Sequence, residues 1–132
     1  MKLPRLLFPL LLATTPLAQA QMVEFPLELI EYIDDVKVVT FVPPSALASA
    51  PTWDPMHQAV PFSLQQALDR VRTRLGNGDY QLTAIELKPI AGHRGHWHYL
   101  VRLRAPDGRP RYFSVLLDGR LLPATREPES YK

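Results

Sequence analysis

The most regular pattern of apolar positions lies in residues 63–76 and predicts an amphipathic helix. Apolar side chains recur there at steps of three and four residues, which places them on one stripe: Leu64, Ala67, Leu68, Val71 and Leu75. Ser63 is a suitable N-cap residue, and Gln66 three positions later completes a capping box. Gly76 is typical of a helix end. We therefore expect one helix here, packed through its apolar stripe against the segments that follow.

Alternation of apolar and polar residues then predicts three strands and a short closing strand, over residues 80–88, 97–105, 111–117 and 121–122. Turn sequences separate them, including Asp107-Gly108 and Asp118-Gly119. In the strand that begins at Trp97, one side is apolar and the other is basic, with Leu100 as the exception. The predicted fold class is therefore α+β: one amphipathic helix packed on a small antiparallel sheet in two layers, preceded by a proline-rich connector.

The N-terminal part of the chain has weaker patterns. Residues 36–42 are rich in β-branched side chains and predict a strand. Residues 24–34 fit either a helix or a strand, and we favour a short helix that ends in a turn at Asp34-Asp35. The five prolines between positions 43 and 61 predict an extended connector. The expected organisation is a helix/strand segment (21–42), the connector (43–62), the α+β domain (63–122) and a polar tail (123–132).

The first twenty residues have the three regions of a secretory signal peptide (1–20). Lys2 and Arg5 are basic, and residues 6–12 are apolar. Ala18-Gln19-Ala20 fits the specificity of signal peptidase, so we expect cleavage before Gln21. A membrane-spanning helix needs about 20 apolar residues, and this apolar run is shorter. The alternative to a cleaved signal peptide is a buried N-terminal strand or a retained anchor. The expected location is therefore periplasmic or secreted, with no transmembrane span after cleavage.

Charge is distributed unevenly along a chain whose formal net charge is +2. Without residues 1–20, 13 basic and 13 acidic side chains remain. Residues 21–69 contain seven acidic residues and one basic residue, whereas residues 70–132 contain twelve basic and six acidic ones. We expect the two halves to attract each other within one fold rather than to bind nucleic acid, which requires a net basic domain. The chain has no cysteine, which excludes disulfides and thiolate metal sites.

Residues 63–122 resemble a PepSY domain, a small module of peptidase propeptides and bacterial envelope proteins. The resemblance lies in the capped helix with SLQQAL, the strand after it, and the segments WHYLVRLRAPDG and YFSVLLDGRLL. The family often has an Asp-x-x-Thr-Gly-like turn before its last strand, where this chain has Asp118-Gly119-Arg120. The resemblance implies a periplasmic accessory role or modulation of a peptidase. It does not extend to residues 21–62.

A histidine-rich stretch is the candidate metal site. His93, His96 and His98 lie close together in the sequence, and neutral imidazoles are common ligands of zinc and copper. On a strand, His96 and His98 project from the same face, with His93 in the loop before it. Arg94 and Arg102 would repel a cation, and a solvent-facing strand start explains the same residues. No cofactor is expected beyond zinc or copper at this cluster.

Arginines of the last strands are the candidate partner-binding residues. Arg102 and Arg104 continue the basic face, and Arg109 and Arg111 lie across the predicted hairpin. Guanidinium groups bind carboxylates bidentately, so an acidic peptide is a suitable ligand for this cluster. A solvated face that pairs with the acidic N-terminal segment is the simpler interpretation. Trp53 in the connector is a further candidate anchor for a partner.

The sequence shows no pattern of an enzyme active site. Its serines lack a G-x-S-x-G context, no glycine-rich phosphate loop occurs, and turns explain the paired carboxylates. We therefore expect an exported, non-catalytic binding protein whose partner is a protein or peptide of the envelope, such as a peptidase. An exposed sheet edge that pairs with an extended peptide is the expected route. The alternatives are a periplasmic metal-binding protein that uses the three histidines and a structural envelope component.

Overall fold

The computed structural model describes residues 24–127, together with Pro4 and Pro9. Apart from these two prolines, the expected signal peptide (1–20) lies outside the described residues, as do its cleavage before Gln21 and the end of the tail (128–132). Among the described residues, no helix is long and apolar enough to cross a membrane.

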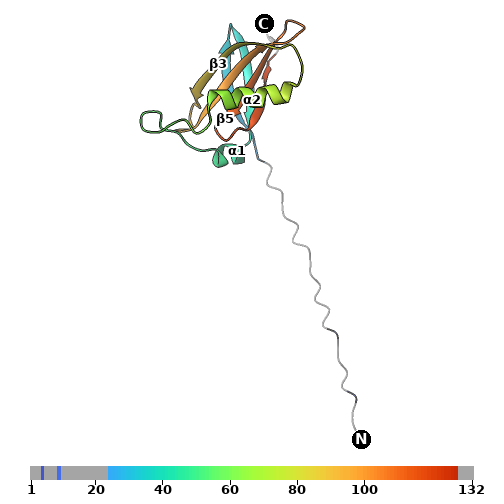
Figure 1. Ribbon diagram of the computed structural model, residues 1–132. Helices are drawn as coiled ribbons and strands as arrows, with labels where there is room; N and C mark the ends of the chain where they lie inside the picture. Colours follow the sequence, from blue (N-terminus) through green and yellow to red (C-terminus); the bar gives the residue numbers. More distant parts are fainter. Residues whose placement is uncertain (1–3, 5–8, 10–23, 128–132) are drawn as a thin grey trace.

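Within residues 24–127, six antiparallel strands form one sheet in the order β1-β2-β6-β5-β4-β3. The strands are β1 (Leu27–Ile33), β2 (Val36–Val42), β3 (Gln81–Pro89), β4 (Trp97–Arg104), β5 (Pro110–Leu116) and β6 (Leu121–Arg126). The sheet curls into a half-barrel whose edges are β1 and β3 (Figure 1). It therefore has an inner face, which the curl partly encloses, and an outer face.

Helix α2 (Leu64–Leu75) lies across the outer face of the sheet (Figure 1). Its capping box is formed as predicted: the Ser63 hydroxyl accepts a hydrogen bond from the Gln66 N–H at 3.1 Å, and the Gln66 side chain accepts one from the Ser63 N–H at 2.9 Å. Ala67 and Val71 of the helix are buried in one core with side chains of β4 and β5 and of the residue after β5: Tyr99, Val101, Leu103, Phe113, Val115 and Leu117. The predicted helix is therefore confirmed.

A second apolar core fills the inner face. At one end of the half-barrel, helix α1 (Pro44–Ser49) contributes Ala46 and Leu47, which pack with Val42, Ile90 and Leu116. Towards the other end, apolar side chains of four strands form a further cluster: Ile33, Val38, Leu100 and Tyr112. Helix α1 therefore closes the end of the half-barrel that lies lowest in Figure 1.

The expectation of one helix on a small sheet is wrong, because this sheet has six strands and is covered on both faces. The alternation in β4 predicted a basic, solvent-facing side opposite the helix. That side is the inner face, where both His98 and Leu100 are buried. Leu100, the apolar exception in the pattern of β4, was thus the local sign of a second core.

Two further corrections concern the segment before α2. Residues 27–33 form strand β1 rather than a helix, because β2 pairs with them along their whole length and their alternate side chains enter the inner core. Residues 43–62 are not extended throughout, since Pro44–Ser49 form α1. Proline is compatible with this helix because the first turn has no intrahelical partner for the backbone N–H.

Strand β6 is longer than the closing strand predicted at residues 121–122. Pro123 argued against a longer strand, because proline lacks a backbone N–H. However, only residues 124–126 of β6 pair with β2, so this pairing begins at Ala124, opposite Thr40 and one residue after Pro123. Pro123 therefore has a paired neighbour only in β5, where it lies opposite Phe113. The pairing of residues 124–126 with β2 brings the N-terminal hairpin into the same sheet as the C-terminal strands.

Asp34 and Asp35 form the turn between β1 and β2, as predicted. Both residues have a positive φ, 50° and 64° respectively, which fits a two-residue type I′ turn. Aspartate tolerates this conformation better than most residues with a Cβ, but glycine adopts it without a steric penalty. The turn therefore forms at some cost in stability.

We predict that Asp35→Gly raises the free energy of unfolding by about 0.5–1 kcal/mol, because it removes this steric penalty. Chemical denaturation followed by circular dichroism measures the change. Glu28→Gly is the control: its site is exposed and extended in β1, so glycine should lower stability there by about 0.5–1 kcal/mol. A loss of stability in Asp35→Gly would show that the carboxylate, not the backbone, determines the turn.

Candidate functional site

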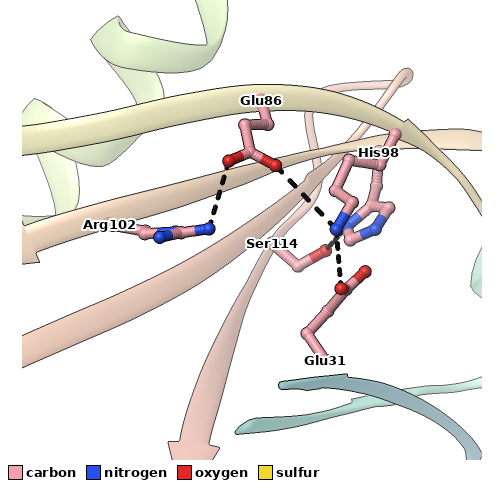
Figure 2. A network of polar contacts seen from close by, with 6 residues as sticks. Glu31, Glu86, His98, Arg102 and Ser114 are labelled. Atoms are coloured by element: carbon pink, nitrogen blue, oxygen red, sulfur yellow. Dashed lines mark hydrogen bonds and ion pairs between the residues drawn. The ribbon is translucent and has the colours of Figure 1, made fainter. Parts of the chain in front are cut away.

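A group of charged side chains lies on the inner face of the sheet (Figure 2). Lys88 Nζ in β3 is 2.6 Å from Glu31 Oε2 in β1 and 3.8 Å from Glu86 Oε2 in β3. Glu86 Oε1 in turn accepts a hydrogen bond from Arg102 Nη2 in β4 at 3.1 Å. The four side chains alternate in sign along this chain of contacts, so each charge has an opposite neighbour.

The Glu31–Lys88 ion pair joins the two edges of the sheet. Strands β1 and β3 are at opposite ends of the strand order, yet these inner-face side chains meet because the sheet curls. In Figure 2, Glu31 and Glu86 point toward each other from the two edge strands. The Lys88 and Glu31 side chains are only 32 % and 25 % exposed, so water and salt screen the pair less than a surface pair. The pair thus ties the open side of the half-barrel together.

His98 and Ser114 extend this polar group into the interior. His98 Nδ1 and Ser114 Oγ are 2.6 Å apart, and both residues are buried. Burial lowers the pKa of His98 to about 4; the nearby Glu31 carboxylate opposes this shift, and the Lys88 ammonium adds to it. The imidazole is therefore neutral at pH 7.

The His98–Ser114 pair does not have the geometry of a hydrolase site. Ser114 is 0 % exposed, so a substrate has no access to its hydroxyl. An imidazole with a pKa of about 4 is also a poor general base at neutral pH. The hydrogen bond instead gives two buried polar groups a partner, which the interior of a protein requires. The pair therefore serves the fold.

A cavity of about 380 Å³ lies at the end of the half-barrel opposite α1. Its walls come from the β1–β2 turn, the bulged start of β3, the β4–β5 hairpin and the end of β6. Three arginines line it: Arg102, Arg104 and Arg126. Arg102 Nε is buried and has no hydrogen-bond partner within the described part of the chain. Because three arginine side chains line one cavity, it is a candidate binding site for an anionic group. We call it the arginine cavity.

The structure separates the four arginines that the sequence suggested as partner-binding residues. Arg102 and Arg104 line the arginine cavity. Arg109 is exposed in the β4–β5 turn, where its Nε is 3.9 Å from Asp107 Oδ2. Arg111 points to the outer face, where its guanidinium lies over the ring of Phe113. The four residues therefore do not form one binding surface.

Arg126 is a member of the cavity that the sequence pattern did not identify. The sequence predicts a polar tail at this position, whereas Arg126 ends strand β6 and lies opposite Val38 of β2. The alternation of Leu122, Ala124 and Arg126 was the available signal, since all three side chains belong to the inner face.

The three histidines suggested as metal ligands have different surroundings. His98 is buried on the inner face, His93 lies in the turn before β4, and His96 Nδ1 is buried without a partner among residues 24–127. No group of three His, Asp or Glu in this part of the chain is placed to hold a metal ion. The geometry therefore gives the metal-binding hypothesis no support.

Trp53 packs against the sheet rather than standing free. Its ring centroid is 5.0 Å from that of Trp97 in an edge-to-face arrangement, and its Nε1 donates a hydrogen bond to the carbonyl of Gln58 at 3.0 Å. Trp97 begins β4, whereas Arg104 ends it. Trp53 and the arginine cavity therefore lie at opposite ends of this strand and do not form a common site.

An exposed apolar surface lies on the outer face of β1 and β2. Ile30, Tyr32 and Phe41 are 44 %, 73 % and 48 % exposed, and Phe25 just before β1 is 83 % exposed. We call Ile30, Tyr32 and Phe41 the outer β1–β2 surface. Strand β1 is also an edge of the described sheet. Exposed apolar side chains beside a strand edge are typical of a protein-binding surface.

Comparisons with known proteins do not assign this chain to a family. No protein-family model, no curated protein and no solved structure matches it. The resemblance of residues 63–122 to the PepSY domain therefore stays a prediction from the sequence.

We predict that the protein loses stability as the pH falls from about 6.5 to about 4, by about 3 kcal/mol through His98 alone. In this range the unfolded chain binds a proton at His98 and the folded chain does not. The contribution is therefore fully present above pH 6.5 and is lost as the pH falls through 4. Urea denaturation at a series of pH values measures it.

His98→Gln removes the titrating group, so this part of the pH dependence should disappear in the variant. His57→Gln is the control, because it removes an exposed imidazole and leaves the surroundings of His98 unchanged, so the loss of stability assigned to His98 should remain. An unchanged profile in His98→Gln would mean that other groups cause the acid sensitivity.

We also predict that Glu31 and Lys88 stabilise the fold cooperatively. A double-mutant cycle with Glu31→Gln and Lys88→Gln should give a coupling energy of about 1–2 kcal/mol, because either single variant leaves one partly buried charge without its partner. The matched control is the Lys37–Glu127 ion pair, in which Lys37 Nζ is 2.9 Å from Glu127 Oε2. Glu127 is more exposed than Glu31, so this pair should couple more weakly. Equal coupling in the two cycles would refute a special role of the edge-to-edge pair.

Proposed function

We propose that this protein is an exported, non-catalytic binding protein that takes up an extended polypeptide segment along edge strand β1. The observation that carries the proposal is the position of the outer β1–β2 surface beside this edge. Strand addition supplies main-chain hydrogen bonds for affinity, and contacts with neighbouring side chains supply specificity.

Strand β1 is better suited to strand addition than the other edge, β3. The register of β3 shifts between Leu82 and Ala84, and the strand ends at Pro89. Bulges and prolines are features by which natural proteins protect a sheet edge from pairing. In contrast, β1 keeps an unbroken register with β2 from Leu27 to Ile33. Its outer edge therefore offers a continuous row of backbone groups to a partner.

The side chains around β1 indicate the kind of segment that would bind. Ile30 and Tyr32 alternate with inner-face residues, so both belong to the outer face, as does Phe41 in β2. A strand added beside β1 would project every second side chain over the same face. We therefore propose a partner segment with apolar or aromatic residues at alternate positions.

The class of partner rests on the sequence. The signal-peptide pattern of residues 1–20 supports export, which makes a periplasmic or secreted protein the expected partner. The PepSY resemblance of residues 63–122 supports a peptidase. A structural envelope component would use the same surface, and the identity of the bound protein distinguishes the two roles.

We expect the double substitution Ile30→Lys and Tyr32→Lys to abolish partner capture, because charged side chains beside an edge strand oppose strand addition. The protein purified after export is immobilised as bait in an envelope extract of its own cells, and mass spectrometry quantifies the bound proteins. Met56→Lys is the matched control: Met56 is an 84 % exposed apolar residue in the loop before α2, and its variant should retain capture.

Undiminished capture by the double variant, or no stoichiometric capture by the unsubstituted protein, would contradict this proposal. If the captured protein is a peptidase, its activity should change when the unsubstituted protein is added and should not change with the double variant.

A further inference from the structure

We propose that the arginine cavity binds a carboxylate that carries an apolar body, and that Arg102, Arg104 and Arg126 hold the charged group. The cavity opens on the inner face of the half-barrel, whereas the proposed polypeptide site is the edge of β1 and the outer β1–β2 surface. Ile33, at the end of β1, is common to both sites, but the residues substituted in the two tests differ, so each site is tested separately.

The cavity has an excess of positive charge. Within residues 24–127, no carboxylate lies within 4.0 Å of the guanidinium of Arg104 or Arg126. Asp34 is the acidic residue of its lining. Glu86 binds Arg102 from outside the lining and is shared with Lys88. The lining therefore has a net positive charge, which an anionic ligand would reduce.

Arg102 has unused capacity as a hydrogen-bond donor. One of its terminal nitrogens donates to Glu86, while its Nε is buried without a partner among the described residues. A buried donor that lacks a partner costs free energy, so Arg102 gains from a further acceptor. Arg102 also lines the arginine cavity, so its side chain lies beside the space that a ligand would occupy.

The remaining lining favours an organic acid over a small inorganic anion. Tyr112 lies on β5 opposite Arg102 in β4 and opposite Ala124 in β6, and therefore contributes an aromatic ring between two arginine-bearing strands. Ile33 and Val36 add apolar side chains from the β1–β2 hairpin. Guanidinium groups bind the planar carboxylate bidentately, while these side chains suit an apolar body. A volume of about 380 Å³ is sufficient for a small molecule or for one or two side chains of a peptide.

The test uses 4-phenylbutyrate as the probe, with its neutral amide, 4-phenylbutanamide, and inorganic phosphate for comparison. Two-dimensional NMR of the protein purified after export follows the amide signals of residues that line the cavity, such as Gly108 and Tyr112. We expect saturable shifts with phenylbutyrate and binding weaker by about tenfold or more for the amide, because the amide cannot form charge-assisted hydrogen bonds. Phosphate should bind more weakly than phenylbutyrate, since it leaves the apolar walls uncovered.

The variant for this test is Arg104→Gln with Arg126→Gln. Both side chains are exposed and form no ion pair within residues 24–127, so the double variant should fold. Its dissociation constant for phenylbutyrate should rise by about tenfold or more. Arg109→Gln removes an exposed arginine from the adjacent turn without altering the lining, and it should bind like the unsubstituted protein.

Three results would overturn the assignment: equal affinity of the double variant and the unsubstituted protein for phenylbutyrate, equal affinity for the acid and its amide, or tighter binding of phosphate. The absence of a saturable shift with phenylbutyrate at millimolar concentration would do the same. Loss of partner capture by the β1 variant has no bearing on these outcomes, because Ile30 and Tyr32 do not line the cavity.

Discussion

The curl of the sheet is the constraint on which the rest of this structure depends. The strands carry large apolar side chains on both faces, but α2 covers only the outer face of β3, β4 and β5. A flat sheet would leave inner-face residues such as Val38, Leu100 and Leu116 in water, at a cost proportional to their exposed apolar area. Curling turns these side chains toward one another, and α1 then needs to cover only one end. The half-barrel thus encloses a second core with little additional helix.

The same curl explains the charges in the interior. It brings the inner-face side chains of β1 and β3 together, and at that distance unlike charges are required because two partly buried like charges would repel strongly. Glu31 and Lys88 meet this requirement, Glu86 and Arg102 continue the alternation, and the neutral His98 adds no charge. Each of these four charges thus has an opposite partner. Toward the end opposite α1, however, Arg102 keeps one nitrogen, Nε, without a hydrogen-bond partner among the described residues.

Both candidate binding surfaces are parts of the sheet that the helices leave uncovered. On the outer face, α2 packs over the C-terminal strands, so Ile30, Tyr32 and Phe41 of the N-terminal hairpin stay exposed. On the inner face, α1 closes one end, so the other end keeps an arginine-lined cavity. An edge strand with apolar neighbours suits a polypeptide, whereas a cationic cavity suits a small acidic group. The fold can therefore present two chemically different sites without a change in its core.

The sequence by itself determined the elements whose signals are local. Caps, turns and apolar periods act over a few positions, so residue types alone predict them. This applies to the helix after Ser63 with its capping box and to the turns at Asp34-Asp35 and Asp107-Gly108. It also applies to the basic pair Arg102 and Arg104. Only the tertiary structure decided whether residues 27–33 are helix or strand, since their apolar positions fit both periods and the pairing with β2 selects one. It also decided that the basic side of β4 faces an interior, and that Arg126 joins the cavity. Both depend on the pairing of β6 with β2 and on the contact between Glu31 and Lys88, which are 57 positions apart in the chain and are brought together by the burial of the inner core.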